Sequence, residues 1–127
     1  MIKCAITDGA YTSGYLPLTQ IINTNSKYAL NGNTVNVKTD GVTDVKANVT
    51  ITATGTTTLT LSLYVNGLPV TGASASITPA NGGTYTLHIN DVIRTIYTED
   101  NEYANVELVL SGACTLVGGD LIMEHSI

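Results

Sequence analysis

The alternation of apolar and polar residues in the middle of the chain limits the possible fold more than any other feature. Between residues 45 and 53, apolar side chains hold every second position: Val45, Ala47, Val49, Ile51 and Ala53. Residues 59–65 repeat the pattern with Leu59, Leu61, Leu63 and Val65. A period of two places alternate side chains on opposite faces of a β-strand. The sequence therefore predicts antiparallel strands, each with one buried and one wet face.

Turn signals divide the rest of the chain into further short strands. Asn66-Gly67 follows the second run directly and predicts a tight hairpin turn, since both residues tolerate a positive φ. Pro69, just beyond, is typical of an edge strand or a strand start. Residues 79–83 (PANGG) and 98–102 (TEDNE) predict loops.

The C-terminal half continues the pattern. We expect a strand with Tyr85, Leu87 and Ile89 inward, a bulge near Asp91, and a closing pair of strands split by Gly118-Gly119. Altogether this makes about eight strands at a spacing of about ten residues, which predicts an all-β antiparallel sandwich of the jelly-roll kind.

The first 26 residues differ from the rest. They contain Gly9, Gly14 and Pro17 and show no sustained alternation. We expect an extended N-terminal arm over residues 1–26, with a short strand near residues 16–22, followed by a jelly-roll head over residues 27–127. The alternative is that a few apolar residues simply complete the sandwich as its first strand: Leu16, Pro17, Leu18, Ile21 and Ile22.

Composition and charge exclude several classes of function. Only 12% of the 127 residues are charged, about half the usual share, so the surface must consist largely of Thr, Ser, Asn and Gly. The net charge is −5, and the five basic residues are scattered rather than clustered, which argues against nucleic acid as a partner. No apolar run is long enough to span a membrane. The first residues lack the apolar segment of a secretory signal, so we expect synthesis in the cytoplasm without a leader.

Residues that carry chemistry are few. His88 falls on the polar side of its strand and His125 lies near the chain end, and we expect both to be solvated or at an interface. No hydrolase elbow, zinc-binding helix or phosphate loop is present. The acidic run at residues 99–102 lacks the spacing of a calcium loop. Cys4 and Cys114 form no CxxC pair, so free thiols are expected. We therefore expect no enzyme activity, no cofactor and no metal.

Tyrosines supply all the aromatic area of the chain, because it has no Phe or Trp. Four of them can stack on sugar rings: Tyr64, Tyr85, Tyr97 and Tyr103. Tyr64 points outward from a strand whose Leu and Val residues point inward. Since tyrosine combines a large area with a hydroxyl that tolerates partial wetting, we expect Tyr64 at a subunit interface.

Three segments carry a resemblance to a known superfamily. They are NTVNVKTDGVTDVKANVTITATG (residues 33–55), LTLSLYVNGLPVTGASASI (59–77) and SGACTLVGGDLIMEHSI (111–127). Their strands and turns resemble the trimeric jelly rolls of the tumour necrosis factor and complement globular-head superfamily. Within it, residues 27–127 look most like small bacteriophage surface proteins of the head-fibre and capsid-decoration kind. The resemblance implies a homotrimer around an apolar axis, and no enzyme activity.

On this resemblance we expect a trimer that decorates a phage particle after assembly in the host cytoplasm, and that lies at the virion surface. The residues expected at the trimer interface are Tyr64, Tyr85, Leu121 and Met123. Those expected to anchor the arm on the capsid or another virion protein are Tyr11, Tyr15, Leu16 and Leu18. The alternative is a receptor- or carbohydrate-binding tip that attaches the particle to a host surface glycan. A third option is a sugar-active enzyme, which needs two carboxylates converging in a cleft.

Overall fold

Eleven strands make up most of the computed structural model, which describes residues 1–95 and 104–126. In chain order they are β1 (Ile2–Ile6), β2 (Gly9–Tyr11), β3 (Leu18–Asn23), β4 (Tyr28–Asn31), β5 (Thr34–Val37), β6 (Gly41–Ala53), β7 (Leu59–Val65), β8 (Leu68–Ile77), β9 (Thr84–Thr95), β10 (Ala104–Leu110) and β11 (Cys114–Ser126). These residues contain no helix.

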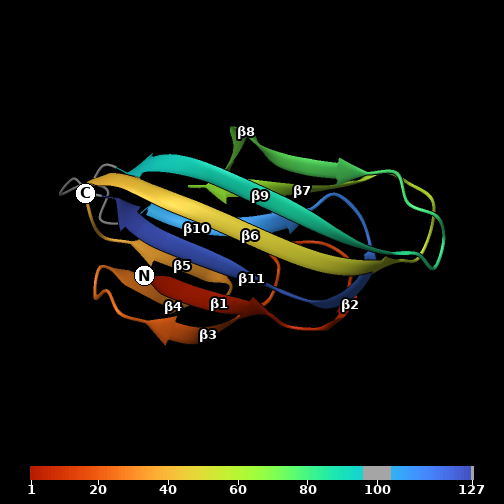
Figure 1. Ribbon diagram of the computed structural model, residues 1–127, viewed down its shortest axis with the longest axis horizontal. Coiled ribbons are helices and arrows are strands. Elements are labelled where there is room, and N and C mark those ends of the chain that lie inside the picture. Colours follow the sequence, from red (N-terminus) through yellow and green to blue (C-terminus); the bar gives the residue numbers. More distant parts are fainter. Residues whose placement is uncertain (96–103, 127) are drawn as a thin grey trace.

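The strands form two antiparallel sheets that lie one behind the other (Figure 1). The first sheet has the order β3-β1-β11-β6-β9, with β2 also paired to β11. The second sheet has the order β4-β5-β10-β7-β8. The predicted antiparallel sandwich is therefore confirmed, although it has eleven strands rather than about eight.

The core between the sheets is built from the alternating residues of the sequence. Every predicted inward residue of β6, from Val45 to Ala53, is buried, as are Leu59, Leu61 and Leu63 of β7. Each fully buried Val, Ile or Leu among them stabilises the fold by about 1.5–3 kcal/mol relative to an exposed one. Two tyrosines, Tyr11 and Tyr28, provide the aromatic part of the core.

The hairpin between β7 and β8 forms as predicted. Asn66 has φ 54° and Gly67 has φ 80°, the positive values that a two-residue turn of this kind requires. Asn66 also fixes the turn to β10, because its backbone N–H donates to the carbonyl of Asn105 (2.8 Å) and its side-chain oxygen accepts from the Asn105 N–H (2.9 Å). The next strand, β8, lies at the edge of its sheet, as Pro69 indicated.

The bulge predicted near Asp91 is wrong. β9 pairs with β6 without a shift from Thr84 to Thr95, and Asp91 lies opposite Val45 on the inward side. Because β9 is an edge strand, a carboxylate can occupy an inward position there and stay partly exposed. The polar side chain of Asp91 at an inward position therefore resembled a shift in the alternation of the sequence, although the pairing of β9 has none there.

The shift of register lies in β11 instead, between Leu116 and Gly118. The strand continues across Gly118 and Gly119, so the expected division into two short strands is wrong. Gly119 has φ 136°, and a Cβ there would lie 1.9 Å from the carbonyl oxygen of Asn48 on β6. Only glycine permits this approach between the two backbones.

The extended arm over residues 1–26 is also wrong. β1 lies inside the first sheet, where Ile2 pairs with Met123 and Cys4 with Leu121, and neither Ile2 nor Cys4 is exposed. The alternation of β1 covers only five residues, and its partner comes from the other end of the chain. A local pattern does not show such a partner. The alternative, that the apolar residues near position 18 complete the sandwich as its first strand, is correct in part. Leu16 and Leu18 are buried and a strand covers Leu18–Asn23, but it is the third strand, and Ile21 and Ile22 are exposed.

Candidate binding surfaces

The outward face of the first sheet is charged and partly apolar. Pairing registers place six charged side chains on it: Lys3, Asp44, Lys46, Arg94, Asp120 and Glu124. Four exposed aliphatic side chains, one each on β3, β6, β9 and β11, lie on the same face: Ile22, Val42, Val92 and Val117. The three positive and three negative charges balance, so this face has no net charge from these groups.

A row of hydrogen bonds crosses three strands of this face. Asn48 Nδ2 donates to Asp120 Oδ1 (3.1 Å), and His88 Nδ1 contacts Asn48 Oδ1. Since the amide oxygen of Asn48 is an acceptor, Nδ1 of His88 carries the proton. His88 is exposed, as the sequence predicted. Hydroxyl pairs extend the pattern along β6 and β9: Thr50 with Thr86, and Thr52 with Thr84.

The outward face of the second sheet is almost uncharged. Small, amide, hydroxyl and tyrosine side chains cover it: Ala29, Asn31, Thr34, Asn36, Thr60, Ser62, Tyr64, Pro69, Ser74, Ser76, Asn105 and Val109. Tyr15 forms an isolated antiparallel β-bridge with Val109, and its side chain is 43% exposed. Among the described residues of these five strands, Glu107 is the one charged side chain on this face.

Glu107 is buried although it points outward from the central strand of its sheet. Its side chain is 5% exposed, and Oε2 accepts a hydrogen bond from Thr34 Oγ1 (2.9 Å). Oε1 is buried and has no hydrogen-bond partner. An unpaired buried acceptor costs about 1–3 kcal/mol. Tyr64 lies directly opposite on β7 and is half-buried. Sequence reasoning missed Glu107, although a lone carboxylate within ANVELVL was a visible signal.

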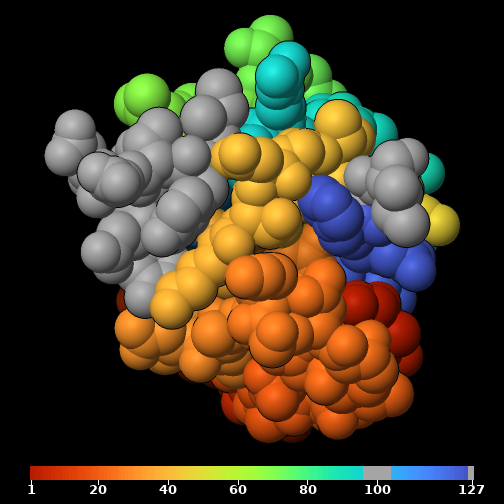
Figure 2. Space-filling view, turned by 90° about the vertical axis from the view of Figure 1, so that its left-hand side faces the viewer, coloured from red at the N-terminus to blue at the C-terminus, as the bar shows by residue number. Residues whose placement is uncertain are grey.

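One end of the sandwich holds buried polar groups. The hydroxyls of Tyr28 and Thr43 are 3.3 Å apart, and Nδ1 of the half-buried His125 has no partner. Burial raises the pKa of the Tyr28 phenol. A Cβ on Gly41 would lie 2.8 Å from Cε1 of His125, so the imidazole packs directly on the backbone. Figure 2 shows this end, where the orange segment around β4 meets the gold start of β6.

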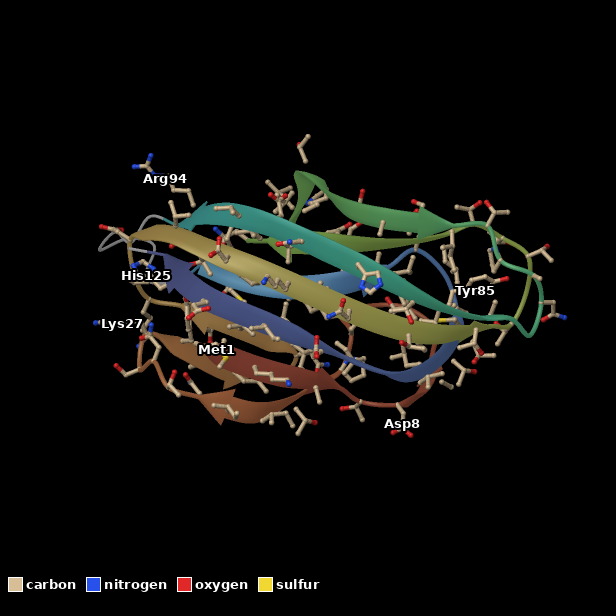
Figure 3. All side chains as sticks on the ribbon, viewed as in Figure 1. Met1, Asp8, Lys27, Tyr85, Arg94 and His125 are labelled. Atoms are coloured by element: carbon tan, nitrogen blue, oxygen red, sulfur yellow. The ribbon has the colours of Figure 1, made fainter. Side chains whose placement is uncertain are left out.

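The residues predicted for the trimer interface do not form one surface. Leu121 and Met123 are 0% exposed in the core of the protomer, so they cannot contact a second chain, and the prediction is wrong for both. Their alternation on β11 is compatible with a subunit axis too, but both side chains point into the core between the two sheets. The hydroxyl of Tyr85 accepts from the Ala80 N–H (2.9 Å) and holds its own loop. Tyr85 lies at the end opposite His125 (Figure 3). Tyr64 lies on the other sheet, and its place at a subunit interface stays a prediction.

The predicted anchoring residues lie mostly in the core as well. Tyr11, Leu16 and Leu18 are buried, and the Tyr11 hydroxyl, with its single proton, lies within hydrogen-bond distance of the carbonyl oxygens of Gly14 (2.5 Å) and Leu110 (3.1 Å). Their assignment to an anchor is therefore wrong, because each completes the sandwich. Tyr15 alone of the four is exposed.

Both cysteines are free and buried, and burial raises the pKa of the Cys4 and Cys114 thiols. The described residues contain no group of three or more His, Cys, Asp or Glu side chains that could hold a metal ion. They also contain no helix that could cross a membrane. The predicted loop at residues 98–102, with its acidic run at 99–102, lies outside the described residues, as do Tyr97 and Tyr103.

Comparison with known proteins identifies the fold. No family model matches the chain, and no curated protein matches it in sequence. Among solved structures, the globular domain of zebrafish complement 1qA protein superposes with a TM-score of 0.74, covering 99% of this chain and 96% of that chain at 11% identity. Eiger TNF from S. frugiperda gives 0.71, with 99% and 94% covered at 10% identity. Murine APRIL at pH 5.0 gives 0.70, with 94% and 96% covered at 10% identity.

The fold is a jelly roll of the tumour necrosis factor and complement globular-head type. The superposition extends over nearly the whole chain, including the N-terminal strands. Identities this low establish the fold alone, and function must be argued from the surfaces.

Proposed function

We propose that this protein is a non-enzymatic structural protein that forms a homotrimer and decorates the surface of a bacteriophage particle. Two lines of argument support the proposal. The fold belongs to a type for which the superfamily resemblance implies trimers. The outward face of the first sheet combines aliphatic side chains with balanced charges, and this observation carries the assembly part of the proposal.

The first-sheet face suits contact between copies. Exposed aliphatic side chains on four strands gain free energy when a second copy covers them, at about 25 cal/mol per Å² of apolar area. The net charge of the chain is −5, which opposes association in general. On this face three basic and three acidic groups balance, so it does not add to the repulsion between two copies. Groups of opposite charge can also pair across an interface.

The virion part of the proposal rests on the resemblance and on the character of the surface. A surface with few charges and many hydroxyl groups suits a particle that persists outside the cell. Since residues 1–23 belong to the sandwich, attachment to the capsid would use the folded surface, not a separate arm.

Assembly is tested by the mass of the purified protein in solution. Light scattering is expected to give three times the 13.3 kDa mass of one chain. Val92→Lys places a charge on the first-sheet face and is expected to shift the mass towards the monomer. Ser74→Lys places the same charge on the exposed second-sheet face and is expected to leave the trimer intact. A monomeric wild type, or equal masses for both variants, contradicts the proposed interface.

Location is tested on purified phage particles. Peptides of this chain are expected by mass spectrometry, and antibodies against it should label the capsid in electron micrographs. Finding the chain only in the soluble fraction of infected cells contradicts decoration of the virion.

A further inference from the structure

We propose that the outward face of the second sheet binds a neutral sugar, with Glu107 as the hydroxyl acceptor and Tyr64 and Tyr15 as the flanking aromatic side chains. This inference does not depend on trimer formation or on a phage particle. It rests on the buried carboxylate, on the arrangement of the two tyrosines around it, and on the absence of other charge from the described part of this face.

The unpaired oxygen of Glu107 is the first observation. Buried polar atoms almost always have a hydrogen-bond partner, so an exception needs an explanation. Thr34 satisfies Oε2, and no described residue satisfies Oε1. A donor from outside the protomer would complete the carboxylate. Because Oε1 is buried, a ligand reaches it only if a neighbouring side chain moves. In the proposed site that side chain is Tyr64, which is half-buried and lies directly opposite Glu107 across the β7–β10 pair.

The tyrosines are the second observation. In the antiparallel register Glu107 lies beside Tyr64, and the next outward residue of β10, Val109, lies beside Tyr15. The two tyrosines therefore flank the Glu107–Val109 pair on opposite sides. None of the described residues forms a hydrogen bond with either phenol group. Aromatic rings with free hydroxyls offer both a stacking surface and polar contacts to a sugar ring.

The surrounding chemistry selects the class of ligand. A metal ion would find a single carboxylate here, and the described residues provide no cluster of metal ligands. An acidic sugar would be repelled by Glu107, because the described residues of the five strands on this sheet include no basic side chain to offset its charge. A neutral sugar fits, since its vicinal hydroxyls donate to the carboxylate and its C–H faces pack on the tyrosines.

The test begins with the wild-type protein on an array that pairs neutral sugars with acidic counterparts. Lactose, maltotriose, cellotriose and mannotriose are the neutral probes, with 3′-sialyllactose and trigalacturonate as the acidic ones. Binding of at least one neutral probe and of neither acidic probe is expected. Binding of acidic probes only, or of no sugar at millimolar concentration, overturns the proposal.

Variants then locate the site by titration calorimetry with the strongest neutral probe. Glu107→Gln, which keeps the shape and removes the charged acceptor, is expected to weaken binding about tenfold. Tyr64→Ala is expected to weaken it by a similar factor. Thr86→Ala, on the opposite face, should change the affinity less than twofold. Melting curves verify that each variant is folded. Wild-type affinity in folded Glu107→Gln overturns the proposal.

A measurement on the unmodified chain covers the case in which a variant does not fold. On adding the same sugar, amide NMR shifts are expected on β7 and β10, around Tyr64 and Glu107. Shifts confined to β6, β9 and β11 would place the sugar on the other sheet and contradict the assignment.

Discussion

The two outward faces of the sandwich differ sharply, although the inner faces behind them are alike. Both sheets turn Val, Leu, Ile and Ala towards a common core. Outward, the first sheet has six charged and four exposed aliphatic side chains, whereas the second has neutral side chains around the buried Glu107. Folding requires only that outward residues tolerate water. The proposed partners, a second copy for one face and a neutral ligand for the other, account for this systematic difference.

The largest expected effect separates the inner face from the outer face within one strand. Leu61→Asp buries an unpaired carboxylate in the core and is expected to destabilise the fold by more than about 4 kcal/mol, so that no folded protein is recovered. Thr60→Asp, one residue away on the outward side, should be nearly neutral. Expression and thermal melting of the pair measure this contrast, and equal stabilities would show that the assigned register of β7 is wrong.

A second contrast concerns the backbone that supports the first face. Gly119→Ala forces a Cβ against the Asn48 carbonyl and is expected to lower the free energy of unfolding by at least about 3 kcal/mol. Gly55→Ala is the matched control, since nothing lies within 4 Å of its added Cβ and its φ is ordinary. Urea denaturation of both variants provides the comparison. A stable Gly119→Ala protein would mean that β6 and β11 can separate without loss.

The smallest effect is a dependence of stability on alkaline pH that arises in the first sheet, where both thiols lie. Burial raises the pKa of Cys4 and Cys114, so the folded state holds these protons more tightly than the unfolded state does. The contribution of the two thiols to stability should be constant below about pH 8.5. Above it, each thiol should remove up to about 1.4 kcal/mol per pH unit, until the pH passes the folded-state pKa.

The double variant Cys4→Ala, Cys114→Ala should remove this first decline. The later titration of Tyr11 and Tyr28, whose pKa burial also raises, would remain. The midpoints of urea denaturation of the wild type and of the double variant, measured between pH 7 and 10, test this expectation. An identical decline in the double variant would assign it to other groups.

Local sequence patterns predicted the parts of the fold that are defined locally. The alternation of β6 and β7 and the Asn66-Gly67 turn each follow from a few neighbouring residues, and the structure confirms them. The strand β1 was missed because its partner, β11, lies at the other end of the chain. The same reason explains Leu121 and Met123: alternation shows which side of a strand is apolar, but not what covers it.

The candidate sugar site was even harder to predict. Tyr64 was correctly placed outward, but nothing in the order of residues shows that Tyr15, from a segment expected to be an arm, lies on the same face. The burial of Glu107 follows from the packing of neighbouring strands, which only the structure provides.

The pairing of Ile2 with Met123 has a consequence for biosynthesis. The central strands of the first sheet come from opposite ends of the chain, so a ribosome must release almost the whole polypeptide before this sheet can close. Folding dominated by such distant contacts is slow, on the order of milliseconds to seconds. Throughout translation, the apolar sides of β1 and β6 lack the strand that separates them. Until β11 is released and pairs, the newly made chain therefore exposes apolar surface and unpaired strand edges, which favour aggregation.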